Sequence, residues 1–75
     1  MTIHVDHTAA ILTFLDGARG WHTAEAICAA VAPSANAGVI AVQCRALAAE
    51  RRCRREFNAQ EGIAQYRANT GKTYR

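Results

Sequence analysis

The chain has 75 residues, which leaves room for one small domain over residues 1–75 and excludes a large enzyme fold with a deep substrate cleft. The hydrophobic share of 51%, much of it alanine, predicts a thin, helix-rich core, and the charged share of 20% excludes a disordered polyelectrolyte. Residues 1–44 hold one arginine against three acidic residues, whereas residues 45–75 hold eight arginine or lysine residues against three acidic ones, so the second half should attract anions.

The first helical pattern lies near residues 7–16, after an extended start over residues 1–5. Asp6 can cap this helix and Gly17 can end it. Its apolar residues recur at helical spacing and predict one core-facing stripe. They are Ile11, Leu12, Phe14 and Leu15. After the helix, Gly20 allows a turn and Trp21 provides a large apolar anchor.

The second helical pattern lies near residues 23–32. Thr23 is its natural cap, and Glu25 sits in the first turn, where the helix dipole favours an acid. Pro33 ends the helix at or before Ala32, because a residue before proline avoids helical geometry. The core-facing residues follow the spacing i, i+3, i+4, i+7. They are Ala24, Ile27, Cys28 and Val31.

The third helical pattern lies near residues 36–51 and begins at a cap formed by Ser34 or Asn36. Its core stripe is Ile40, Cys44 and Leu47, at i, i+4 and i+7. A second apolar stripe holds Val39 and Ala46, which we expect in the core, and Val42, which fits either the core or an interface. The remaining face is almost bare. It consists of Ala37, Gly38, Ala41, Arg45, Ala48 and Ala49.

Two short strands are predicted over residues 53–57 and 63–68. The intervening segment has turn formers at each end, and Gly62 can take the positive φ that a hairpin loop needs. Residues 69–75 have the composition of a polar tail. The predicted fold class is therefore mostly α (α+β), with three helices followed by a two-stranded β-hairpin.

This order of elements resembles the winged helix-turn-helix DNA-binding domain of small bacterial or phage-type regulators. The segment HTAEAICAAV is similar to the second helix of that family. The segment NAGVIAVQCRALAAERRCRREF is similar to its recognition helix running into the first wing strand. The resemblance covers residues 7–68 and implies a short strand near Trp21 that pairs with the hairpin. It also suggests that Trp21 packs on Phe57 or Tyr66, with stacking on single-stranded nucleic acid as the alternative.

The resemblance implies binding to double-stranded DNA without catalysis, as in a small transcriptional regulator of this family. The third helix would enter the major groove, and the wing would touch backbone or minor groove. On the helix, the implied groove-facing residues are Asn36, Ala37, Gly38, Ala41, Val42 and Arg45. On the wing, the implied contacts come from Arg54, Arg55, Asn58, Gln60 and Arg67. Two-fold dimers are common among such proteins, and a homodimer here would use the first helix or a tail.

The strongest charge signal is a cluster of four arginines within five positions. It consists of Arg51, Arg52, Arg54 and Arg55. This number exceeds what a helix dipole needs and points to contact with phosphate or with an acidic partner. The third helix has few long polar side chains for base edges, namely Asn36, Gln43 and Arg45. This shortage keeps a second interpretation open, a protein-binding module such as a small phage- or plasmid-type inhibitor or adaptor of a host machine.

The three cysteines do not form an even disulfide set, and we expect free, reduced thiols in a cytoplasmic protein. All three cysteines are expected as small buried hydrophobic residues, and the alternative for Cys53, which lies beside arginines, is a lowered pKa and a reactive thiol. The sequence predicts neither a secretory signal nor a membrane-spanning segment.

Two further motifs fail on their spacing. His4 and His7, with Cys28, do not make the four-ligand set that zinc needs, so no metal site is predicted. The segment 71–73 has the sequence GKT of a phosphate-binding loop, but Tyr66 stands where that motif requires glycine. No catalytic residue and no cofactor is predicted.

Overall fold

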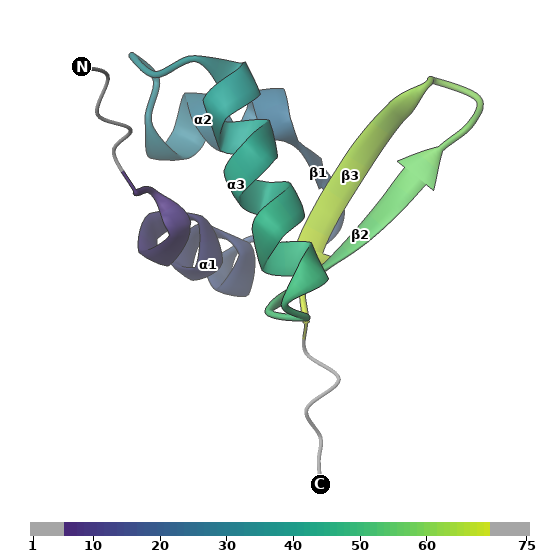
Figure 1. Ribbon diagram of the computed structural model, residues 1–75, viewed down its shortest axis with the longest axis horizontal. Helices are drawn as coiled ribbons and strands as arrows, with labels where there is room; N and C mark the ends of the chain where they lie inside the picture. The colour runs from purple at the N-terminus through teal and green to yellow at the C-terminus, as the bar shows by residue number, and fades with distance from the viewer. Residues whose placement is uncertain (1–5, 70–75) are drawn as a thin grey trace, which may run out of the picture.

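The computed structural model describes residues 6–69 and shows a small α+β domain with three helices and a three-stranded antiparallel sheet (Figure 1). The elements are α1 (Thr8–Gly17), β1 (His22–Thr23), α2 (Ala24–Val31), α3 (Ala37–Ala49), β2 (Cys53–Asn58) and β3 (Ile63–Ala68). The predicted bounds agree within two residues. The extended start over 1–5, the tail beyond residue 69, His4 and the 71–73 segment lie outside the described residues.

Short polar side chains cap α2 and α3 as predicted, whereas the predicted cap of α1 by Asp6 is wrong, because the N-cap of α1 is His7 and its side chain makes no capping hydrogen bond. The Oδ1 atom of Asp6 accepts hydrogen bonds from the backbone N–H and the hydroxyl of Thr8, at 2.9 and 2.6 Å. Thr23 caps α2 by accepting from the N–H of Ala26 at 3.1 Å. Asn36 caps α3, and Ser34 does not. Each cap satisfies a backbone donor that the helix itself cannot pair.

The core lies where the three helices meet the base of the sheet. The stripe of Ile40, Cys44 and Leu47 is buried, which confirms the predicted phase of α3. The other buried residues are Ile11, Leu15, Ile27, Cys28, Cys53, Tyr66 and Ala68. Leu12 and Phe14 pack against this cluster while remaining partly exposed. Within the described part of the chain, all three cysteines are free and buried.

The second apolar stripe of α3 is mostly outside the core. Ala46 is exposed, so its predicted burial is wrong. Val39 is half-buried, and Val42 is 61% exposed to solvent. The cause is that α3 is apolar almost all round, because its alanines are small and carry no charge. Apolar character alone therefore does not identify the side that faces α1 and α2.

The C-terminal end of α3 is closed by a Schellman motif built around Arg51. The N–H of Arg52 donates to the carbonyl of Leu47 at 2.9 Å, and the N–H of Arg51 donates to Ala48 at 3.0 Å. Arg51 occupies the left-handed region with φ 63°, a position that usually belongs to glycine. The side chain of Asn69 also donates to the Arg51 carbonyl at 2.8 Å. An arginine is thus held in a strained conformation next to the basic hairpin.

Replacing Arg51 by glycine should stabilise the fold by about 0.5–1 kcal/mol. The substitution removes the Cβ strain of the left-handed conformation, which exceeds the extra backbone entropy that glycine loses on folding. Urea unfolding of wild type and Arg51→Gly gives the difference directly. Arg52→Gly is the control, and it should not stabilise, because Arg52 does not have a positive φ. Equal or lower stability of Arg51→Gly would contradict the strain.

The sheet has β3 at its centre, between β1 and β2. β1 lies directly after Trp21, where the resemblance implies a short strand, and pairs His22 with Tyr66. In the hairpin, Arg55 pairs with Tyr66 and Arg54 pairs with Arg67. Successive residues of a strand point to opposite faces, so Arg54 and Arg55 lie on opposite faces of the hairpin. The hairpin extends beyond the helices, as Figure 1 shows.

Two aromatic contacts join the segment after α1 to the rest of the domain. The guanidinium of Arg67 lies over the ring of Trp21, 5.5 Å from its centroid. The His22 ring packs edge-on against Phe14 with centroids 5.0 Å apart. Phe57, one of the two packing partners expected for Trp21, is 56% exposed near the hairpin tip. The partner of Trp21 found here is therefore an arginine.

Candidate nucleic-acid interface

The arginines of the described segment 6–69 have almost no acidic partners within it. One ion pair forms there, between Arg52 and Glu50 at 3.7 Å, and both side chains are more than half exposed. Such an exposed pair contributes little to stability. The other guanidinium groups of this segment form no ion pair with its carboxylates, and they belong to Arg19, Arg45, Arg51, Arg54, Arg55 and Arg67. They are therefore able to bind anions from outside the chain.

Two of the predicted arginines come together in a groove between α3 and the hairpin. Arg45 lies on α3 and Arg55 on β2, and both line this groove with Ala41, Ala64 and Tyr66. Glu25, in the first turn of α2, lines the same groove and is its one acidic residue. The small alanine side chains leave the groove open between the two guanidinium groups. The groove thus presents two positive charges against one negative charge.

Arg54 and Arg67 are on the other face of the hairpin. They are directly opposite each other on β2 and β3, whereas Arg55 faces the α3 side with Tyr66. Four arginines of the third helix and the wing are predicted to contact DNA, and the structure divides them into two pairs. They are Arg45 with Arg55, and Arg54 with Arg67. One pair shares the groove with α3, and the other pair lies on the outer face of the sheet.

The N-terminal half of α3 carries a shallow apolar groove. Asn36, Gly38 and Val42 line it, with Val39 and Gln43. The carboxamide oxygen of Asn36 is already used, because it accepts from the N–H of Gly38 at 2.6 Å. The Gln43 carbonyl oxygen likewise accepts from the N–H of His7 at 2.9 Å and ties α3 to the start of α1. Arg45 is thus the long polar side chain best placed to read a base on this helix.

The predicted contacts at the hairpin tip and at the helix end differ in their accessibility. The Asn58 carboxamide oxygen accepts from the N–H groups of Gln60 and Glu61 at 3.0 and 3.1 Å, so Asn58 shapes the loop. Gly62 has φ 70°, as the loop required. Gln60, Arg51 and Arg52 are exposed and can meet a partner.

No family model, curated protein or solved structure matches this chain. Charge and shape are therefore what bear on its function. Among residues 6–69, no helix is long and apolar enough to cross a membrane. In the same segment, no three histidine, cysteine or acidic side chains gather where they could hold a metal ion.

The thiols of α3 and β2 are shielded from the arginines next to them in sequence. Cys53 is 3% exposed, and burial raises the pKa of its thiol. Cys53 is therefore a buried hydrophobic residue, as expected, and the alternative of a lowered pKa is wrong, because loss of water outweighs the attraction of the exposed arginines. Burial, together with the nearby Cys53, raises the pKa of Cys44 to about 12. Both thiols remain protonated and unreactive at neutral pH.

Two residues of the basic surface are absent from the set predicted from the sequence. Arg19 follows α1 and lines a pocket with Arg67, although the two are far apart in the chain. Trp21 contacts Arg67 as described above. No local pattern indicates either contact, since both depend on how β3 docks beside the first turn. The division of Arg54 from Arg55, in contrast, follows from strand alternation alone.

Proposed function

We propose that this chain is a non-catalytic DNA-binding protein, a small transcriptional regulator of winged helix-turn-helix architecture. In this proposal α3 is the recognition helix and the β2–β3 hairpin is the wing. The observation that carries it is the shared groove of Arg45 and Arg55, which come from α3 and from the hairpin. Two unpaired guanidinium groups that flank one concave surface suit the phosphates and base edges of a duplex.

The exposed side of α3 supports close approach to DNA. Gly38, Val42, Ala46 and Ala49 are exposed, and none has a long side chain. A helix with such a surface can lie deep in the major groove, where valine can touch a thymine methyl group. Arg45 would then reach a guanine edge, and Arg55 would bind backbone phosphate without reading sequence. The additional positive charge at Arg51 and Arg52 would strengthen attraction to any duplex.

The proposal includes a cytoplasmic location, supported by three free cysteines that suit a reducing compartment. It also includes a two-fold dimer, because two half-sites multiply the affinity of a small module. Sedimentation with and without duplex tests this arrangement.

Removing the groove arginines should weaken duplex binding in two different ways. Arg55→Gln should lower affinity for every duplex by a similar factor and flatten the slope of log affinity against log salt by about 0.9. Arg45→Gln should lose roughly 1–3 kcal/mol on a preferred site selected from random duplexes, and little elsewhere. Mobility-shift titrations over a salt series measure both effects.

The matched control is Glu25→Gln, which removes the carboxylate of the same groove. It should tighten binding, because a negative charge beside the two guanidinium groups is lost. Absence of wild-type binding to any duplex at low salt would refute the proposal. Equal effects of Arg45→Gln on preferred and random duplexes would refute the base-reading role of Arg45, but they would not refute duplex binding.

A second candidate function is favoured by the exposed apolar surface of α3. Val42 is 61% exposed and borders a shallow apolar groove, which also suits a protein surface. In this alternative the chain is a protein-binding inhibitor or adaptor whose arginines meet acidic residues. Val42→Lys separates the two functions. It disrupts an apolar protein contact, whereas its added positive charge keeps the attraction to the phosphates of a random duplex.

A further inference from the structure

The outer face of the sheet carries a second positively charged surface, away from the α3 groove. Its centre is Arg67 on β3, whose guanidinium lies over the Trp21 ring at 5.5 Å. This contact holds a long, flexible side chain in one place, and Arg67 is accordingly only half exposed. A guanidinium that is already ordered loses less conformational entropy when it binds a ligand.

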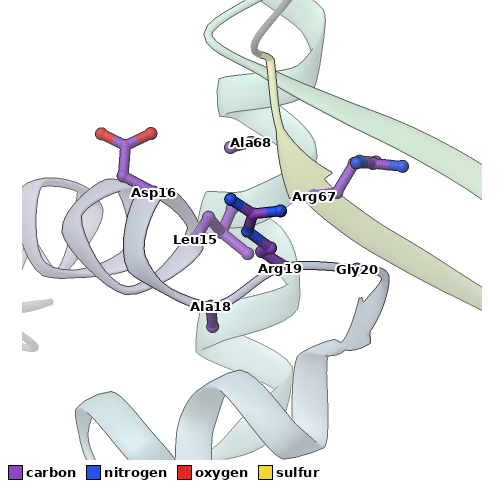
Figure 2. Close-up of a pocket in the computed structure, with 7 residues that line it drawn as sticks. All are labelled: Leu15, Asp16, Ala18, Arg19, Gly20, Arg67 and Ala68. Carbon is purple, nitrogen blue, oxygen red and sulfur yellow. The ribbon is translucent and has the colours of Figure 1, made fainter.

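Arg19 adds a second positive charge at the edge of this surface, because it lines a pocket together with Arg67. A pocket lies between the segment after α1 and the end of β3, and both arginines line it with Leu15, Ala18 and Gly20. Figure 2 shows the Arg19 guanidinium between α1 and β3, whereas the Arg67 side chain extends from the other side of that strand. The carboxylate of Asp16, which also lines this pocket, points away from the Arg19 guanidinium in the same view.

Arg54 adds a third charge from the neighbouring strand. Its Cα partner across the hairpin is Arg67, so the two arginines share one face at the shortest cross-strand separation. Two like charges directly opposite each other destabilise a hairpin unless a counter-charge lies between them. No carboxylate of residues 6–69 lies within ion-pair distance of either guanidinium. Glu56, further along the same face, is opposite Gln65.

We propose that Arg19, Arg54 and Arg67 form a binding site for a phosphate group, with Trp21 as the platform that orients Arg67. Guanidinium groups match the oxygens of phosphate in charge and geometry, and a bound phosphate neutralises the repulsion between Arg54 and Arg67. The phosphate belongs either to a single strand of nucleic acid or to a small phosphorylated molecule. The site is on the face opposite Arg55 and does not rest on duplex binding by α3.

The test uses Trp21 as its reporter, because the chain contains one tryptophan. Trp21 emission is recorded while the full chain is titrated with inorganic phosphate in one arm and with single-stranded hexathymidylate in the other. Sodium chloride holds the ionic strength constant in both arms. We expect a saturable change in emission in at least one arm, and about tenfold weaker binding by Arg19→Gln and by Arg54→Gln, since each loses a charge-assisted hydrogen bond.

The matched control is Arg55→Gln, which removes the same charge from the next residue of β2 on the opposite face. In the inorganic phosphate arm its affinity should fall by less than that of Arg54→Gln. Arg19, Arg54 and Arg55 are all exposed, so these substitutions leave the fold intact, and thermal melts check this. A free-phosphate response points to a small phosphorylated ligand, and a response to the oligonucleotide alone points to a nucleic-acid strand.

Either of those two responses supports the site. The absence of a saturable change in both arms would overturn it, as would equal weakening by Arg55→Gln and Arg54→Gln. Failure here is distinguishable from failure of duplex binding, because neither arm contains duplex and the residues replaced in Arg19→Gln and Arg54→Gln do not line the α3 groove.

Discussion

Ile40→Asp will leave the chain without a cooperative folded state. Ile40 is 0% exposed and lies on the buried stripe of α3, between α1 and α2. The aspartate would have to bury an unpaired charge and would also lose the packing of a large aliphatic side chain. The combined loss is more than about 5 kcal/mol, which equals or exceeds the stability of most domains this small. A thermal melt followed by circular dichroism measures the outcome.

The control for Ile40→Asp is at Val42, two residues further along the same helix. Val42→Asp introduces the same side chain at a position that is 61% exposed, and its unfolding free energy should stay within about 0.5 kcal/mol of wild type. A cooperative melt of Ile40→Asp within a few degrees of wild type would mean that the phase of α3 is wrong.

Stability should decrease steeply in alkaline solution because of Cys44. Burial raises the pKa of this thiol from 9.0 to about 12 in the folded chain. Above pH 9 the unfolded chain releases the thiol proton while the folded chain keeps it, so unfolding becomes more favourable as pH rises. The contribution of the protonated Cys44 thiol to the free energy of unfolding is fully present below pH 9 and is lost as the pH rises through 12. Between pH 8 and pH 11 it amounts to about 2.5 kcal/mol.

Urea unfolding of wild type and Cys44→Ala at both pH values isolates this contribution. The variant is less stable at pH 8, because it leaves a small cavity, but it should lose about 2.5 kcal/mol less than wild type on going to pH 11. Cys53→Ala should show a change of the same sign, since burial also raises the Cys53 pKa. Parallel losses in wild type and Cys44→Ala would show that the folded thiol titrates normally.

The elements of the fold were predictable because each has a local signal. Thr23 and Asn36 are capping residues, Pro33 stops α2, and Gly62 permits the hairpin loop. The core stripe of α3 was also predictable, since its large side chains recur at helical spacing. The exposure of Ala46 was not, because alanine fits both the core and the surface and carries no information on direction.

The candidate interface was predictable in its composition and only partly in its arrangement. The excess of arginine in the second half of the chain identifies the basic surface. The pairing of Arg45 with Arg55 in one groove depends on the angle at which the hairpin leaves α3, and no local pattern encodes that angle. The place of Arg19 beside Arg67 depends on the docking of β3 on the segment after α1, a contact between distant parts of the chain.

The position of β3 also determines the order in which the molecule can fold. β3 is the last element of the described chain, yet both other strands bond to it and neither bonds to the other. The helices can make their contacts early, because they are close in sequence, whereas β1 must wait for a partner that closes a long loop. The amides of His22 and Thr23 should therefore gain protection from hydrogen exchange together with the hairpin, and never before it. Until that moment Tyr66, which is 2% exposed in the folded chain, remains in solvent.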